Sequence, residues 1–228
     1  MSIAAVFTSA AALRAGDDRA VVRAILDKIG RSETQVEEVT EFSREGDRVI
    51  VLNLNRRGLS AGRITEFPEE IFLLTGLKGL LLKGNDLESL PEGIGGMTSL
   101  IELNLADNDR LGTLPASIGS LKNLRTLDVR TCGLSGLPPE IGGLKSLETL
   151  QLWGNHFTEL PPVVLELTAL KELYLSNNKL TTLPSGITRM KNLKYIDAQR
   201  NSLCNLPSAI DTWLKGLDRR YRDHQWCN

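Results

Sequence analysis

The 228-residue chain is short of residue types that several protein classes need. It has 3 cysteines and 2 histidines, too few for a disulfide-dense scaffold or a metal site with several such ligands. A formal net charge of −1 argues against a nucleic-acid binder that tracks phosphates and against a polybasic membrane anchor. No apolar run approaches the ~20 residues that a membrane-spanning helix requires. We therefore expect no cofactor, no metal ion, no nucleic-acid partner and no membrane span.

Leucine is the residue in excess: 40 of the 228 residues are leucine, whereas aromatic residues make up only 5%. The leucines recur at a fixed period, with spacings of 23, 24, 23, 23 and 23 residues between Leu77, Leu100, Leu124, Leu147, Leu170 and Leu193. Each unit follows the pattern L-x-x-L-x-L-x-x-N-x-L-x-x-L-P-x-x-I-x-x-L-x-x. A period of this size is typical of a solenoid built from stacked units.

Two further slots of the unit are strongly biased. The asparagine slot holds Asn85, Asn108, Cys132, Asn155, Asn178 and Asn201. All nine prolines, from Pro68 to Pro207, stand in the L-P slot or directly after it. This joint spacing of leucine, asparagine and proline identifies a true repeat.

The pattern resembles the leucine-rich-repeat proteins over roughly residues 49–214. Its second half is similar to the 23-residue subclass of plant Ras-group-related repeat proteins, Ras suppressor and erbin-like proteins, and several bacterial effectors. The resemblance implies a right-handed α/β solenoid with a parallel sheet on its concave face and helical caps. We expect an N-terminal helix and hairpin cap over 1–48, about seven repeats over 49–213, and a C-terminal cap over 214–228.

Elementary geometry agrees with this fold. L-x-x-L-x-L predicts a short strand in which Leu103 and Leu105 point inward while Glu102, Asn104 and Ala106 point outward. The slot asparagine follows the strand, where its amide can satisfy backbone groups of adjacent turns. Proline then ends regular pairing, and the I-x-x-L spacing predicts a short helix or 3₁₀ turn on the convex side.

Solenoid ends need caps, and both flanks of the repeat provide candidates. Asp17 or Asp18 can N-cap a helix that runs to Ile29 and ends at Gly30. Residues 36–42, a turn over 43–47 and residues 48–54 predict a hairpin that leads into a first repeat with Arg57 in its asparagine slot. A C-terminal helical cap is predicted from Trp213, Leu214, Leu217, Tyr221 and Trp226, with Arg219, Arg220 and Arg222 outward. The apolar stretch from Ile3 to Leu13 is either a targeting segment or an N-terminal extension.

Catalytic constellations are not evident. The glycine pairs 95–96 and 142–143 recur at the repeat period and belong to convex turns, so they do not form a phosphate-binding loop. His156 has no Ser or Cys nucleophile at a suggestive spacing and is interpreted as an exposed turn residue. Asp107 and Asp109 lack the Gly and the distant Glu of a calcium loop. The sequence does not predict an enzyme.

The cysteines leave two alternatives open. Cys132 is expected to be a buried thiol in the asparagine ladder. Cys204 and Cys227 either form a disulfide that staples the cap, as in an exported protein, or stay reduced. A zinc site of Cys204, His224 and Cys227 would lack a fourth ligand. The absence of a cysteine-rich flanking cap favours a reducing compartment, so a cytoplasmic location is expected and secretion is the alternative.

Outward strand positions form three columns on the concave face. The first column contains Val51, Gly79, Glu102, Thr126, Thr149, Glu172 and Tyr195. The second contains Asn53, Leu81, Asn104, Asp128, Gln151, Tyr174 and Asp197. The third contains Asn55, Lys83, Ala106, Arg130, Trp153, Ser176 and Gln199. Trp153, Tyr174 and Tyr195 therefore lie on one diagonal across three adjacent strands. Aromatic residues with a polar rim are typical of an interface hot spot. The predicted partner-binding residues are Asp128, Arg130, Gln151, Trp153, Tyr174, Tyr195, Asp197, Gln199 and Arg200.

These observations predict a monomeric protein–protein interaction module, such as a signalling scaffold, that binds another protein on its concave face. The alternatives are a bacterial-type secreted effector, an exported ligand sensor or adhesin, and the recognition part of a larger enzyme.

Overall fold

A computed structural model describes residues 17–44, 46, 48–56, 62–218, 221 and 225–227. Several predictions fall on other residues and lie outside the described ones: the segment from Ile3 to Leu13, the slot residue Arg57, His224 and the cap arginines Arg219, Arg220 and Arg222. In the described part, no helix is long and apolar enough to cross a membrane.

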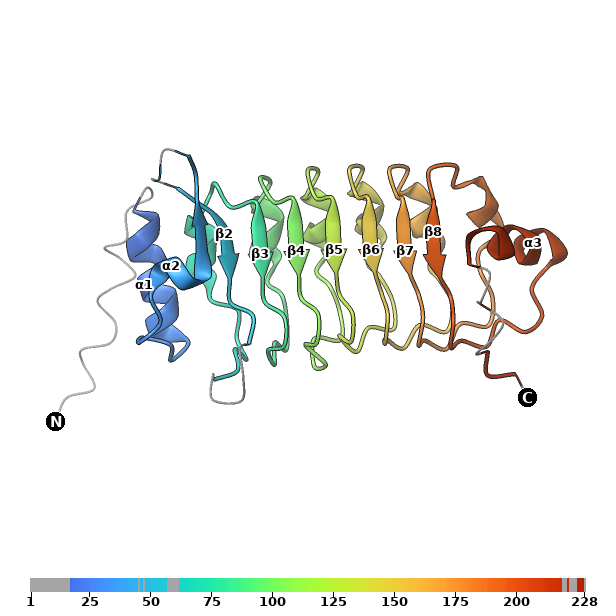
Figure 1. The fold of residues 1–228 in the computed structure, drawn as a ribbon, viewed down its shortest axis with the longest axis horizontal. Helices are drawn as coiled ribbons and strands as arrows, with labels where there is room; N and C mark the ends of the chain where they lie inside the picture. The colour runs from blue at the N-terminus through green and yellow to red at the C-terminus, as the bar shows by residue number, and fades with distance from the viewer. Residues whose placement is uncertain are drawn as a thin grey trace.

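One sheet of eight strands runs the length of the molecule in chain order (Figure 1). The strands are β1 (Thr40–Phe42), β2 (Val49–Asn53), β3 (Gly79–Leu81), β4 (Glu102–Asn104), β5 (Thr126–Asp128), β6 (Thr149–Gln151), β7 (Glu172–Tyr174) and β8 (Tyr195–Asp197). β1 is antiparallel to β2, whereas β2 to β8 are parallel neighbours. The predicted α/β solenoid with seven parallel rungs is confirmed.

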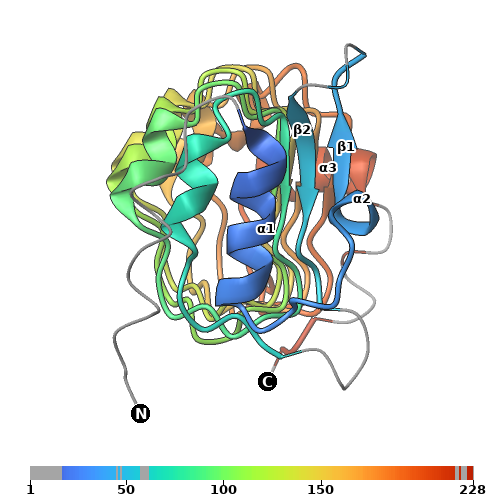
Figure 2. The same cartoon turned by 90° about the vertical axis from the view of Figure 1, so that its left-hand side faces the viewer.

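A layer of short 3₁₀ helices lies behind the sheet (Figure 2). These helices are η2 (Glu69–Leu73), η3 (Glu92–Gly96), η4 (Ala116–Ser120), η5 (Pro139–Gly143), η6 (Pro162–Glu166) and η7 (Ser185–Arg189). Each has a proline at its N-cap, where the ring fixes φ and no backbone N–H is needed for strand pairing. The isoleucine slot of each turn is buried against the strand leucines, so the core lies between the two layers.

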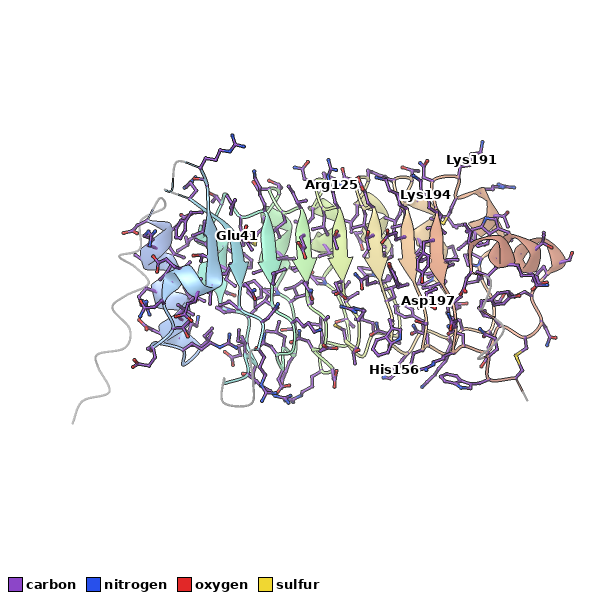
Figure 3. All side chains as sticks on the ribbon, viewed as in Figure 1. Glu41, Arg125, His156, Lys191, Lys194 and Asp197 are labelled. Atoms are coloured by element: carbon purple, nitrogen blue, oxygen red, sulfur yellow. A yellow bond between two sulfur atoms is a disulfide. The ribbon has the colours of Figure 1, made fainter. Side chains whose placement is uncertain are left out.

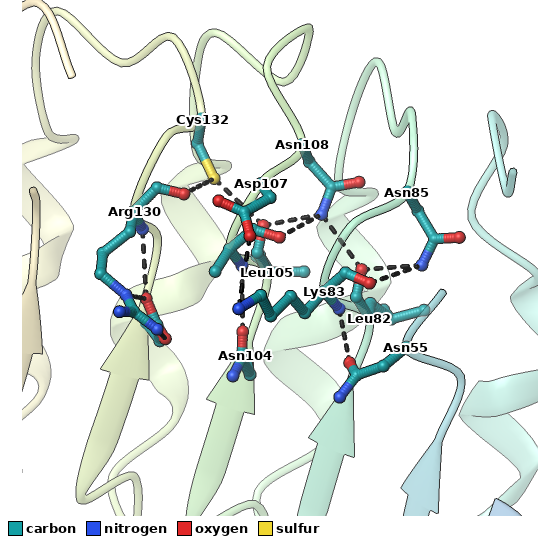
Figure 4. A network of polar contacts seen from close by, with 12 residues as sticks. Asn55, Leu82, Lys83, Asn85, Asn104, Leu105, Asp107, Asn108, Arg130 and Cys132 are labelled. Carbon is teal, nitrogen blue, oxygen red and sulfur yellow. Dashed lines mark hydrogen bonds and ion pairs between the residues drawn. The ribbon is translucent and has the colours of Figure 1, made fainter. Parts of the chain in front are cut away.

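The slot asparagines form a continuous buried ladder along the solenoid (Figure 4). Asn178 shows the pattern: its Oδ1 accepts from the Phe157 N–H at 3.1 Å, and its Nδ2 donates to the carbonyls of Leu152 and Leu175 at 2.9 Å each. Each amide thus joins its own rung to the rung before it. Cys132 fills the slot as predicted, fully buried, with its Sγ 3.1 Å from the Leu105 carbonyl oxygen.

Burial raises the pKa of the Cys132 thiol to about 12. The native state therefore keeps a proton that the unfolded chain, with a thiol pKa of about 8.5, releases first. The contribution of the protonated thiol to the free energy of unfolding is fully present below the thiol pKa of the unfolded chain. It is lost as the pH rises toward 12, the thiol pKa of the native state. Between pH 9 and pH 10 we expect wild type to lose about 1.2 kcal/mol more unfolding free energy than Cys132→Ala in urea titrations. Parallel losses in both proteins would contradict a buried neutral thiol.

The N-terminal cap consists of two helices and β1. Helix α1 (Asp18–Lys28) is N-capped by Asp17, whose side chain accepts from the Ala20 N–H, and it covers the open end between the two layers (Figure 2). Residues Val36–Val39 form helix α2, so the prediction of a strand from residue 36 is wrong there. A capping box between Gln35 and Glu38 and two buried valines at helical spacing favour the helix. The hairpin is therefore limited to β1 and β2.

The C-terminal cap begins at helix α3 (Ser208–Leu217), which contacts both η7 and β8 at the end of the solenoid. Leu214 and Tyr221 are buried as predicted, but Trp226 is exposed, so its predicted packing in a helical cap is wrong. The helix ends because Asp218 is extended and turns its carboxylate to the Ala198 N–H at 3.1 Å. Cys204 and Cys227 form a disulfide with a Cα–Cα distance of 5.8 Å.

Side chains from both caps complete the ends of the asparagine ladder. At the C-terminal end, Gln225 accepts from the Leu203 N–H at 2.9 Å and donates to the Ala198 carbonyl at 3.0 Å. These are the contacts that the next slot asparagine would make. At the N-terminal end, Arg31 donates to the Leu54 carbonyl at 3.2 Å. The ladder therefore ends on cap residues rather than on open backbone groups.

Candidate partner-binding face

We call the side of the sheet that faces away from the 3₁₀ helices the strand face; it is the face predicted to be concave. The register of β2 to β8 aligns every member of the first two predicted columns, from Val51 with Gly79 to Tyr174 with Asp197. The inward residues between these columns, such as Leu103 and Leu150, are fully buried. The predicted alignment of the first two columns is confirmed.

The predicted aromatic residues lie on the C-terminal half of this face. Tyr174 and Tyr195 pack against each other with ring centroids 5.2 Å apart and planes tilted by 47°. Tyr195 is 42% exposed and Trp153, which lies just beyond the C-terminal end of β6, is 37% exposed. Only Ile101 and Trp226 are other large hydrophobic residues with comparable exposure in the described part of the chain. The exposed rings of Trp153 and Tyr195 are therefore not part of the buried core.

Asp128 and Arg130 form a closed pair next to the aromatic residues. Asp128 is 3% exposed, and its two carboxylate oxygens accept from Nε and Nη2 of Arg130 at 2.9 and 2.7 Å. This hydrogen bonding raises the pKa of the Arg130 guanidinium further above its ordinary value. Asp128 is thus positioned to orient Arg130, which is half-buried, rather than to touch a partner itself.

Two other carboxylates near the rings accept bonds from neutral groups. Asp197 accepts from the Ser176 hydroxyl at 2.6 Å and from the Gln199 N–H at 3.3 Å. Glu172 accepts from the Tyr174 hydroxyl at 3.2 Å. Burial, followed by the charge and the hydrogen bond of Glu172, raises the pKa of Tyr174. Glu172 was not among the predicted site residues, although its column position opposite Tyr195 could have identified it.

The rest of the predicted rim is mixed in exposure. Gln151 and Gln199 are half-buried, and Arg200 is exposed in the left-handed backbone region with φ of 52°. Ala106 and Ser176, which the third column placed outward, are buried. Leu81 is half-buried between the aligned residues Asn53 and Asn104. The third column therefore offers fewer contact residues than the first two.

The residues weighed for chemistry are separated from one another. His156 is exposed in a turn at the far edge of the strands from Arg125 (Figure 3). Asp107 lies 3.4 Å from Lys83 Nζ. Across the described residues there is no group of three or more His, Cys, Asp or Glu side chains arranged to hold a metal ion. The cysteines weighed as zinc ligands, Cys204 and Cys227, are joined to each other.

A second concavity lies on the opposite side of the solenoid. This pocket of about 390 Å³ lies between η6 and η7 and is lined by Leu165, Leu167, Thr168, Leu170, Gly186, Arg189, Met190, Lys191 and Asn192. It lacks aromatic side chains, which gives it less apolar contact area for a partner than the strand face.

Comparison with known families finds repeats in the same part of the chain. A family model described as "Leucine-rich repeat region" matches residues 115–214, and one described as "Leucine Rich Repeat" matches residues 99–121. The mouse protein leucine-rich repeat serine/threonine-protein kinase 1 is 35% identical over 80 residues. That match covers 35% of this chain and only 4% of the kinase.

Solved structures match over more of the chain. A leucine-rich-repeat protein of Leptospira interrogans superposes with a TM-score of 0.67 and 35% identity, covering 74% of this chain and 41% of that one. The plant peptide hormone receptor RGFR1, solved in complex with RGF2, gives a TM-score of 0.59 and 32% identity. There the match covers 67% of this chain and 25% of the receptor. This chain thus spans less than half the length of each of these proteins.

Proposed function

Because this chain is a leucine-rich-repeat protein, we propose that it is a recognition module that binds a protein or peptide partner on the C-terminal half of its strand face. The exposed rings of Trp153 and Tyr195 carry this proposal, with Tyr174 packed beside Tyr195. Tyr and Trp dominate binding hot spots because they bury a large area at little entropic cost. The receptor RGFR1, whose structure holds a bound peptide hormone, supports a peptide or protein as the class of partner.

No catalytic role is part of the proposal. Asp128 and Arg130, the acid and base nearest each other among the predicted site residues, form a closed pair. The kinase activity in the name of the mouse relative belongs to a protein of which this chain covers 4%.

We also infer that the protein works in an oxidising compartment. The Cys204–Cys227 disulfide supports the exported alternative over the cytoplasmic location that the cysteine content favours. Within the proposal, an exported ligand sensor or adhesin is therefore the more specific candidate.

The proposal is tested with the variant Trp153→Ala, Tyr174→Ala, Tyr195→Ala. We expect its circular dichroism spectrum to match wild type, because these rings are not needed for the core between the two layers. In affinity capture from extracts of the source organism, the variant is expected to lose at least ~10-fold of the specifically retained partner, the effect of deleting a hot spot.

The matched control is Ile101→Ala, which removes an apolar side chain that is as exposed as Trp153 but lies before β4. The control should retain the partner. Identical capture by wild type and the triple variant would place the binding site elsewhere and contradict the proposal.

A further inference from the structure

Two adjacent strands of the strand face carry aromatic and acidic side chains in alternation. The register of β7 and β8 aligns Glu172 with Tyr195 and Tyr174 with Asp197. The two rings therefore occupy one diagonal of a two-by-two square and the two carboxylates occupy the other. We call these four residues the acidic aromatic square.

Within the described part of the chain, no basic side chain pairs with either carboxylate of the square. Neither Glu172 nor Asp197 forms an ion pair with a described residue. Glu172 accepts a hydrogen bond from a hydroxyl group, and Asp197 accepts one from a hydroxyl group and one from a backbone N–H. The preceding residue Lys171 is paired with Glu148 at 2.6 Å. Lys194 lies at the opposite end of β8 from Asp197 (Figure 3). The square thus holds two negative charges beside two ring faces.

The contrast with Asp128 shows that this arrangement is local. Asp128 stands in the same column as Asp197, three strands away, but its carboxylate is closed by a bidentate contact with Arg130. A guanidinium thus already occupies an aspartate of this column within the chain itself. Burial is the main cause that raises the pKa of Tyr174, and the charges of Glu172 and Asp197 add to it.

We propose that the acidic aromatic square, with Trp153 beside it, binds an arginine side chain of the partner. This inference rests on the proposed function, since it names the group that the partner presents to the same face. A guanidinium is planar, so it can stack on a tyrosine ring while its N–H groups point to a carboxylate in the same plane. The alternation of rings and carboxylates offers both contacts at once. An ammonium group would use only one of them well.

The probe is a blocked pentapeptide with one arginine between glycines, compared with the same peptide carrying citrulline or lysine in its place. Citrulline keeps the shape of arginine without its charge. In a low-salt titration followed by amide NMR, we expect the arginine peptide to shift the resonances of β7 and β8. It should bind at least ~10-fold more tightly than the citrulline peptide. Equal affinity for arginine and citrulline, or for arginine and lysine, would overturn the proposal.

The variant is Glu172→Gln with Asp197→Asn, which removes both charges and keeps the shape of each side chain. It should fold, because Asn53 and Asn104 already make the backbone contact of Asp197 in the same column, at 3.2 and 3.0 Å. We expect its affinity for the arginine peptide to fall at least ~10-fold. The matched control is Glu102→Gln, an exposed carboxylate in the column of Glu172 without aromatic residues on its aligned neighbours. Its affinity should not change.

Capture of the partner separates the two proposals. If the triple alanine variant loses the partner while Glu172→Gln with Asp197→Asn retains both partner and peptide, the binding face stands and the arginine proposal fails. If the triple alanine variant retains the partner, the proposed function itself fails. Loss of partner and peptide in the charge variant supports both.

Discussion

Asn155→Leu is expected to lower the free energy of unfolding by about 3 kcal/mol or more, because each buried backbone group left unpaired costs at least ~1 kcal/mol. The Asn155 Oδ1 accepts from the N–H groups of Cys132 and Leu134, both at 3.0 Å. Its Nδ2 donates to the carbonyls of Val129 and Leu152 at 2.9 and 3.0 Å. Only the Leu152 carbonyl keeps a second donor, Asn178, after the substitution.

Asn178, the next slot asparagine of the ladder, has fewer backbone partners that depend on it than Asn155 has. Asn178 accepts from one backbone N–H, that of Phe157, whereas Asn155 accepts from two, because the N–H of the slot residue Cys132 also donates to it. Asn178→Leu leaves only the Phe157 N–H unpaired, because the Leu152 and Leu175 carbonyls keep Asn155 and Asn201 as donors. We therefore expect Asn155→Leu, which leaves three groups unpaired, to be more destabilising than Asn178→Leu by about 2 kcal/mol. Asn192→Leu is the control: this exposed amide makes one contact, with the Thr168 carbonyl, and its loss should change stability by about 0.5 kcal/mol or less. Urea unfolding of the three variants measures all of these differences. An unchanged unfolding curve for Asn155→Leu would contradict the ladder.

The repeat could be predicted from the sequence because each of its slots has a separate physical cause. Leucine alternation predicts the inward side of a strand, asparagine predicts the ladder, and proline predicts the start of the convex turn. The rungs from β3 to β8 keep these three slots with few substitutions, such as Cys132 for asparagine and Ile196 for leucine, so an error in one slot could not shift the register. The columns of the strand face followed from that register alone.

The caps could be predicted less completely because they occur once and no period checks them. Val36 and Val39 suit a strand or a helix, and the contact between Gln35 and Glu38 decided for the helix. Gln225 completes the ladder at a repeat-like spacing from Asn201, but it is a glutamine in a tail that lacks the repeat leucines. Neither feature has a sequence signal strong enough to find it in advance.

The candidate site could be predicted only in outline. Column positions identified the rings, but they did not indicate that Asp128 is closed by Arg130, since that contact depends on side-chain conformation. Glu172 stood in the correct column and was missed because its significance depends on its alignment with Tyr195. Sequence patterns therefore predicted which residues face outward, while side-chain contacts decided which of them can meet a partner.

Removal of the Cys204–Cys227 disulfide is expected to lower the free energy of unfolding by about 3 kcal/mol, the loop-closure value for cysteines 23 residues apart. The double variant Cys204→Ser, Cys227→Ser tests this expectation in guanidinium titrations. Wild type in reductant should then unfold like the double variant, and reductant should not affect the variant. Cys132 is buried and unchanged in both proteins, so it cannot account for a difference.

The loss of stability should be confined to the C-terminal end of the solenoid. Gln225 and Trp226 directly precede Cys227 and hold the last rung through the Leu203 N–H and the Asn201 carbonyl, at 2.9 and 2.7 Å. Without the disulfide, that tail loses its covalent link to Cys204, so the Leu203 amide should exchange its hydrogen much faster. The amides of β4 and β5 lie several rungs away and should exchange as before, because each rung contacts only its neighbours. Equal exchange at Leu203 in wild type and the double variant would mean that the ladder end holds the tail by itself and that the disulfide acts only on the unfolded chain.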